Sequence, residues 1–195
     1  STKLEGGDHT APFFSGIGEN SADCVLEGLY ANSGPNDATT GNACLLGTGQ
    51  RNEIRDSVLR FPSHTGAGLT IQSYPTAGNS SADCGYRNVT LHLPKGQRFF
   101  AVYDAGGGMT RPYFVDCRCF GTVTDYAGSI TGDQGRLENV WCEAGALFFQ
   151  GVVTNWTITG CYFPDGFSNL NRTFLVGNNI SDNESDSSRR IASAA

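Results

Sequence analysis

Short stretches that alternate apolar and polar residues recur along the chain, each built around a Gly, Asn or Asp. Seven of them read LEGLYA, IRDSVL, YRNVTL, FVDCRC, LENVWC, ITGCYF and LVGNNI. Each has an apolar residue two positions before the turn-forming residue and an apolar residue or cysteine three positions after it. This spacing predicts a short strand that leaves a tight corner. The turn-forming residues, called anchors below, are Gly28, Asp56, Asn88, Asp116, Asn139, Gly160 and Gly177.

The distances between anchors indicate the coils of a solenoid. Successive anchors are 28, 32, 28, 23, 21 and 17 residues apart, a spread that fits strands joined by loops of variable length. The pattern therefore predicts an all-β fold, a short single-stranded parallel β-helix of about seven coils. Further strand candidates lie between the anchors, at 43–47, 68–74, 99–104, 128–132 and 146–153.

The repeat divides the chain into three parts. It covers residues 21–182, which we expect to form the β-helix. Residues 1–20 lack it and contain Phe13 and Phe14, so we expect an N-terminal cap or docking arm over one end of the solenoid. Residues 183–195 have the polar composition of a tail. We expect contacts with a neighbouring molecule to order that tail.

Composition agrees with a turn-rich β protein and excludes other classes. The 195 residues include 26 Gly together with many Ser, Thr and Asn, which favour turns over helix interiors. Aromatic residues make up 11% of the chain, enough to build a core, so most of the chain is not disordered. The net charge of −6 argues against binding to nucleic acid. No apolar run reaches the length of a membrane span, so no membrane partner is expected.

The coil pattern resembles that of the right-handed parallel β-helix superfamily, which contains polysaccharide lyases and hydrolases and many phage tailspike and appendage proteins. The resemblance rests on an apolar residue, any residue, an Asn, Asp or Gly, and then alternating β-formers, over about residues 21–182. It implies a right-handed coil, in keeping with the bias of parallel crossovers. It also implies a homo-oligomer, with a trimer favoured because trimers are common among phage appendages.

The seven cysteines include no C-x-x-C motif, so no zinc ribbon is indicated, and their odd number leaves any disulfide framework incomplete. We expect the inward-facing ones to stack as free core thiols, without a metal or a cofactor. Free thiols fit assembly in a reducing host cytoplasm. A metal or redox site is the alternative. The cysteines on inward positions are Cys117, Cys119, Cys142 and Cys161.

Histidines and glycosylation sequons give weak signals. The histidines His9, His64 and His92 are isolated and lack the spacing of a zinc site. Because Asn88 is a corner residue that we expect to be buried, we interpret the N-x-S/T sequons as a by-product of the repeat. They lie at Asn79, Asn88, Asn155, Asn171, Asn179 and Asn183.

Catalytic signals are sparse. The resemblance implies that an enzyme would work from carboxylates on an outer face, yet the N-T-D, D-D, G-H-G and R-I-K motifs of the polygalacturonase type are absent. Stacked coils could bring two acids within the roughly 5 to 9 Å that a glycosidase needs. A solvated acidic surface is the alternative that we favour. The acids in the middle coils are Asp104, Asp125, Asp133 and Glu138.

Large side chains recur on the outward side of the predicted strands. The position two after each anchor is outward, and Trp141 and Tyr162 should be neighbours on adjacent coils. Phe120, four after its anchor, extends the same strip. Such a strip suits sugar rings or another subunit, unless loops fold over it. The candidate binding residues are Tyr30, Phe120, Trp141 and Tyr162.

Two functional hypotheses follow. The first is a virion structural protein, a phage decoration, fibre or tail-associated module that is located in the virion, packs against other virion subunits and attaches to the host surface. The second is a carbohydrate-active module that binds or cleaves a surface polysaccharide as a lyase or glycoside hydrolase. The missing catalytic motifs favour the first hypothesis and a role that is not enzymatic.

Overall fold

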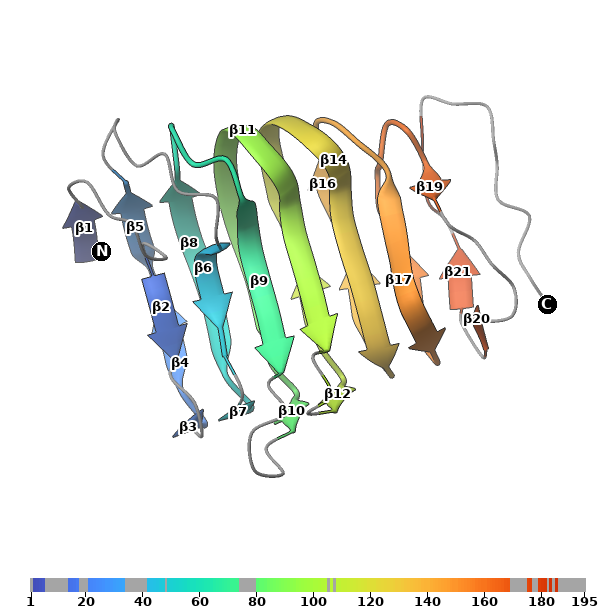
Figure 1. Cartoon of the computed structure of the whole chain (residues 1–195). Helices are drawn as coiled ribbons and strands as arrows, with labels where there is room; N and C mark the ends of the chain where they lie inside the picture. The colour runs from blue at the N-terminus through green and yellow to red at the C-terminus, as the bar shows by residue number, and fades with distance from the viewer. Residues whose placement is uncertain are drawn as a thin grey trace.

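The computed structural model describes residues 2–5, 14–17, 21–33, 42–47, 49–73, 80–104, 106, 108–168, 175–176, 179–181, 183 and 185. These residues form strands and turns, with no helix among them, and the strands pair in one all-parallel sheet. The sheet winds into a solenoid whose coils lie side by side from β1 to β21 (Figure 1). The predicted all-β parallel solenoid is therefore confirmed. The described residues include no helix that could span a membrane.

Two ladders of parallel strands meet at the anchors. The strands that precede the anchors are β4 (Val25–Glu27), the start of β8 (Glu53–Arg60), the start of β11 (Gly85–Asp104), β13 (Tyr113–Val115), β15 (Arg136–Glu138), β18 (Thr157–Thr159) and β21 (Asn179–Ser181). The ladder that follows the anchors contains β1 (Thr2–Glu5), β5 (Leu29–Asn32), later parts of β8 and β11, the start of β14 (Arg118–Asp133), and β16 (Trp141–Cys142).

Two further ladders complete each coil. One ladder contains β2 (Phe14–Ile17), β6 (Asn42–Leu46), β9 (Ala67–Ser73), the ends of β11 and β14, β17 (Leu147–Thr154) and β19 (Phe167–Ser168). The other contains β3 (Ser21–Ala22), β7 (Gly49–Gln50), β10 (Ser81–Ala82), β12 (Met109–Thr110) and β20 (Leu175–Val176), joined by the last residues of β14 and β17. Strands β11 and β14 bend from one ladder into the next (Figure 1).

The anchors form a corner of left-handed backbone. All six anchors in the described residues have φ between 49° and 67°, a region that glycine, Asn and Asp tolerate best. Side chains also link this corner from coil to coil. Asn88 Nδ2 donates to Asp56 Oδ1 at 2.7 Å, and Asn139 Nδ2 donates to Asp116 Oδ1 at 3.0 Å. The predicted corner role of these residues is confirmed.

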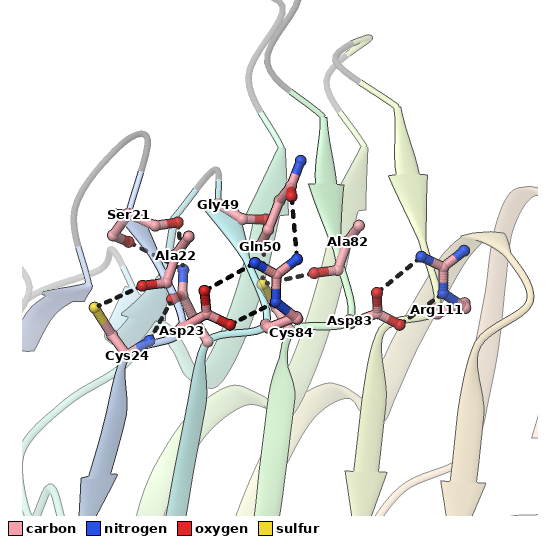
Figure 2. Close-up of polar contacts among 12 residues, drawn as sticks. Ser21, Ala22, Asp23, Cys24, Gly49, Gln50, Ala82, Asp83, Cys84 and Arg111 are labelled. Carbon is pink, nitrogen blue, oxygen red and sulfur yellow. Dashed lines mark hydrogen bonds and ion pairs between the residues drawn. The ribbon is translucent and has the colours of Figure 1, made fainter.

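A second left-handed corner lies five residues before each anchor, and sequence patterning did not identify it. Its residues alternate in charge over four coils, and two ion pairs bridge adjacent coils, Arg51 to Asp23 and Arg111 to Asp83 (Figure 2). The nearby Arg51 and Arg111 side chains lower the pKa values of Asp23 and Asp83, respectively. The corner residues are Asp23, Arg51, Asp83, Arg111, Gln134 and Asn155, with φ between 53° and 57°.

The core fills the interior of the coils with aromatic and sulfur-containing side chains. All seven cysteines are free thiols, and six are buried, whereas Cys24 is partly exposed. Cys119 and Cys142 are register partners on adjacent coils, as the sequence predicted. Burial raises the pKa of Cys44 and of Cys161 to about 12, so both stay protonated at neutral pH.

Two details of the sequence interpretation are wrong. Ile180 pairs with Ile158, two residues before an anchor, so Asn179 aligns with Thr157 and not with the outward position of Tyr162. The last coil is therefore shifted by five residues relative to the predicted repeat, and Gly177 itself lies outside the described residues. Asn88 was expected to be buried but is exposed, because the corner projects its side chain along the surface.

The predicted limits of the end segments remain predictions. Strand β1 pairs with β5, and β2 pairs with β6, so the described residues of the predicted cap continue two ladders of the sheet. The rest of residues 1–20 lies outside the described residues. In the predicted tail, Asn183 is described, and its Nδ2 donates to the Ile158 carbonyl at 3.0 Å.

Candidate functional site

The outward positions that follow the anchors form a continuous column. Tyr30 pairs with Val58, Val58 with Thr90, and Thr90 with Arg118. Arg118 pairs with Trp141, which forms a parallel bridge to Tyr162. The register therefore places Trp141 and Tyr162 next to each other on adjacent coils, as the repeat predicted.

Four rings of this surface form the aromatic strip, which comprises His92, Phe120, Trp141 and Tyr162. The ring centroids of His92 and Phe120 are 5.2 Å apart, those of Phe120 and Trp141 are 5.3 Å apart, and those of Trp141 and Tyr162 are 5.7 Å apart. All four side chains are partly exposed. Sequence reasoning missed His92, although it lies four residues after its anchor, as Phe120 does.

Tyr30 lies in the same column but is not part of the aromatic strip. Val58, Thr90 and Arg118 separate it from Trp141 along the column. Its ring instead lies beneath the guanidinium of Arg60, at 5.8 Å from the centroid. Of the four candidate binding residues, the structure thus brings Phe120, Trp141 and Tyr162 together and places Tyr30 elsewhere.

A hollow of about 270 Å³ opens beside the aromatic strip. Gly160 helps to keep the space open, because a Cβ at that position would lie 2.6 Å from Asn139 Oδ1. Tyr162 stacks against Trp141 with an angle of only 11° between the rings, whereas Phe120 is tilted by 45°. The residues that line the hollow are Arg118, Phe120, Asn139, Trp141 and Gly160.

Arg118 differs from the other arginines in the part of the chain that the structure describes. Each of the others forms an ion pair with a carboxylate or lies over a tyrosine ring. Arg118 is exposed and does neither within the described residues. Its guanidinium is therefore available to a ligand in the hollow.

The four acids proposed as weak catalytic candidates are engaged by separate partners. Asp104 accepts hydrogen bonds from Ser73 Oγ at 2.8 Å and from the amides of Gly106 and Gly108. Partial burial raises the pKa of Asp104, but these hydrogen bonds outweigh burial, so the net pKa is lowered. Asp125 forms an ion pair with Arg98 at 3.1 Å.

The other two candidate acids have partners of their own. Asp133 accepts hydrogen bonds from Thr154 Oγ1 at 2.6 Å and from Asn155 Nδ2 at 2.9 Å, and these lower its pKa. Glu138 lies 3.7 Å from the Nε of Arg136. Among the described residues, the recorded contacts join none of the four acids to another.

A polar cluster on the strands before the anchors was also missed by sequence reasoning. Glu53 Oε1 accepts hydrogen bonds from Arg87 Nε and from the hydroxyl of Tyr113, both at 2.9 Å. The guanidinium groups of Arg87 and Arg136 lie 5.6 and 5.7 Å from the centroid of Tyr113. Gly85 is the register partner of both Glu53 and Tyr113. The Tyr113 ring occupies the space that a side chain at position 85 would fill.

The charged groups of this cluster are paired, Glu53 with Arg87 and Arg136 with Glu138. Glu53 is only 9% exposed, and burial, followed by the hydrogen bond to Glu53, raises the pKa of Tyr113. A raised pKa keeps the tyrosine protonated, so it acts here as a hydrogen-bond donor. The sequence feature that could have identified this cluster is position in the repeat. The residues that stand three before an anchor are Glu53, Gly85, Tyr113 and Arg136.

The described residues include no group of three or more side chains that could hold a metal ion. No protein-family model, no curated protein and no solved structure matches this chain.

Proposed function

We propose that this chain is a polysaccharide-binding β-solenoid that serves as a structural and attachment module of a virion appendage. The observation that carries the binding role is the hollow formed by Phe120 and Trp141 together with Arg118 and Asn139. The virion setting is supported by the resemblance of the coil pattern to phage appendage proteins.

The composition of the hollow suits a sugar. The apolar C–H face of a pyranose ring packs against an aromatic ring, while its hydroxyl groups need hydrogen-bond partners at the ring edge. Trp141 and Phe120 supply the apolar walls, and Arg118 and Asn139 supply polar groups. A largely apolar site with a few convergent polar groups is the usual form of a small-ligand pocket. The volume of about 270 Å³ suits one sugar unit of a longer chain.

The site is also rigid before any ligand arrives. Backbone hydrogen bonds join Trp141 N to the Cys117 carbonyl and Tyr162 N to the Val140 carbonyl, each at 2.9 Å, so adjacent coils fix the positions of the rings. Stacking between Trp141 and Tyr162 further limits their rotamers. A preformed site loses little conformational entropy on binding, which favours affinity.

The exposure of apolar side chains favours a glycan over a large dry subunit interface at this surface. Among the described residues, the strongly exposed large hydrophobic side chains are Val25 and Val152, and neither belongs to the aromatic strip. The rings of the strip are half-buried and flank a hollow. The buried centre of a stable protein interface is more apolar than the rest of the protein surface.

Binding to purified capsular polysaccharides and lipopolysaccharide O-chains, measured by calorimetry, tests the proposal. Trp141→Ala is expected to abolish binding that the wild type shows. Phe148→Ala is the matched control, because Phe148 is a half-buried ring stacked on Tyr126 at 4.3 Å in a different ladder. If Trp141→Ala binds as tightly as the wild type, the aromatic strip is not the binding site.

Three further measurements address the mode of action, the virion setting and the oligomeric state. Incubation with a bound polysaccharide should release no new reducing ends and no unsaturated products. Release of either product would show a lyase or hydrolase instead of a binding module. Mass spectrometry of purified phage particles should detect the chain, and light scattering on the purified chain should report an oligomer. Absence from the particles would overturn the virion role.

A further inference from the structure

We infer that the sugar bound in the hollow carries a carboxylate and that Arg118 recognises this group. The inference rests on the proposed function, because it specifies the class of polysaccharide that the same surface binds. It starts from the one guanidinium in the described residues that has no carboxylate partner and no aromatic ring beneath it.

The neighbouring acids of the protein are committed to other donors. Asp116, two residues before Arg118, accepts a hydrogen bond from Asn139 Nδ2 at 3.0 Å. Glu143, on the next coil, accepts one from the amide of Gly121 at 2.6 Å. Neither carboxylate forms an ion pair with Arg118. The guanidinium therefore keeps its hydrogen-bonding capacity for a group that comes from outside.

The side of Trp141 toward Arg118 borders the hollow, and Phe120 lies on that side with its ring centroid 5.3 Å from that of Trp141 and its ring tilted by 45°. Tyr162 covers the opposite side of Trp141 by near-parallel stacking. An arginine beside an indole commonly lies over the ring, within about 6 Å of its centroid. Within the described residues no guanidinium lies over Trp141, whereas Arg60, Arg87, Arg98 and Arg136 all lie over tyrosines. A sugar ring in the hollow can therefore contact Phe120 and Trp141 with its edge directed at Arg118.

The chemistry of the polar groups in the hollow then selects an acidic sugar. A guanidinium binds a planar carboxylate through two parallel hydrogen bonds, a geometry that a hydroxyl group cannot reproduce. Asn139 Oδ1 receives no hydrogen bond from the described residues, so it can accept one from a sugar hydroxyl. One carboxylate and one hydroxyl on the same sugar ring match these two groups.

The net charge of the protein disfavours unspecific binding of polyanions. The net charge of −6 repels polyanions at long range. A single unpaired guanidinium does not form the basic patch that unspecific polyanion binding requires. Recognition must therefore combine the carboxylate with stacking on Trp141, and poly-glutamate and DNA are expected not to bind.

The test compares bacterial capsular polysaccharides that contain hexuronic acids with their carboxyl-reduced forms, in which each carboxylate has become a primary alcohol. The wild type is expected to bind the native forms about tenfold more tightly, the usual loss when a charge-assisted hydrogen bond is removed. Arg118→Gln should remove this preference, so that the variant binds the native and the reduced forms with equal affinity. Arg60→Gln, at an arginine outside the hollow, should keep the preference.

The outcomes separate this inference from the proposed function. Equal binding of native and reduced forms by the wild type, or an unchanged preference in Arg118→Gln, would overturn the carboxylate assignment while the binding role stands. A sulfated neutral polysaccharide that binds with the same dependence on Arg118 would also overturn it. If no polysaccharide binds, native or reduced, the proposed function itself fails.

Discussion

Arg51 and Asp23 form a two-point ion pair between adjacent coils although both have a left-handed backbone. Arg51 Nη2 donates to Asp23 Oδ2 at 2.8 Å, and Arg51 Nε donates to the other carboxylate oxygen. Their φ angles are 55° and 57°. The amides of both residues donate to carbonyl groups of the next coil, at 2.9 Å. The backbone hydrogen bonds between coils therefore hold both residues in the left-handed conformation. The oppositely charged side chains then pair on the surface.

The ion pairs at the second corner should make stability depend on acid pH. The hydrogen bond from Arg111 lowers the pKa of Asp83 below its ordinary value of 3.8. A lowered pKa stabilises the folded state above pH 3.8, and this contribution is lost as the pH falls through the folded-state pKa. Asp83→Asn should therefore be less stable than the wild type at pH 7, with a gap that narrows toward pH 3.

Urea midpoints at both pH values measure this gap. Asp165→Asn removes an exposed acid that forms no ion pair with the residues that the structure describes, and it serves as the control for net charge. A gap between wild type and Asp83→Asn that stays constant from pH 7 to pH 3 would contradict the assignment.

The anchor corner should tolerate glycine better than a β-branched residue. Asn88 has a φ of 49°, and its side chain donates to Asp56. Asn88→Val should lower the free energy of unfolding by about 2 kcal/mol, from left-handed strain and a lost hydrogen bond. Asn88→Gly should lose only about 1 kcal/mol, because it removes the hydrogen bond alone. Equal losses in urea titrations would show that the backbone conformation does not matter here.

The cysteines should differ sharply in reactivity. Cys24 is partly exposed and the other six are buried, so a thiol reagent should label one thiol in the native protein and seven in guanidinium chloride. Raising the pH to 9 should not increase the number of labelled thiols, because burial raises the pKa of Cys44 and Cys161 to about 12. Counting labels by mass spectrometry checks this, with Cys24→Ser as the control that should remain unlabelled. Rapid labelling of several native thiols would contradict the stacked core.

The sequence predicted the anchor corner because Gly, Asn and Asp mark left-handed turns by themselves. It did not predict the second corner, where Arg51, Arg111 and Gln134 have the same conformation. These residues carry no intrinsic turn signal, and hydrogen bonds to neighbouring coils determine their backbone. The five-residue error in the last coil has a related cause. Gly177 resembles an anchor, but the pairing of Ile180 with Ile158 sets the register.

The same reasoning explains what the sequence showed of the candidate site. Trp141 and Tyr162 were predicted as neighbours because both stand two residues after an anchor. The hollow was not predicted, because it is formed by residues of three adjacent coils, Arg118 and Phe120, Asn139 and Trp141, and by the missing side chain of Gly160. The contact between Glu53 and Tyr113 joins residues 60 positions apart and skips one coil, so it requires the register of three coils at once.

Gly85 should be among the least replaceable glycines of the solenoid. A Cβ there would overlap the carbonyl oxygen and the ring of Tyr113, so Gly85→Ala should cost about 3 kcal/mol, the upper range for overpacking. Gly28→Ala meets no atom within 4 Å and should cost about 1 kcal/mol, from its φ of 67° alone. Thermal or urea unfolding measures both variants. A Gly85→Ala variant as stable as Gly28→Ala would show that Tyr113 can move aside.

The two tryptophans should report separately on the core and on the binding surface. Trp156 is fully buried, and its Nε1 donates to the Gly132 carbonyl at 3.1 Å, whereas Trp141 lines the hollow. Trp141→Phe should therefore keep a blue-shifted emission that acrylamide quenches weakly, and it should lose the change in fluorescence that polysaccharide causes in the wild type. The phenylalanine keeps a ring in the aromatic strip, so circular dichroism should be unchanged. Trp156 would be the remaining tryptophan in Trp141→Phe, so a polysaccharide response that persists in this variant would show that Trp141 is not the residue that reports binding.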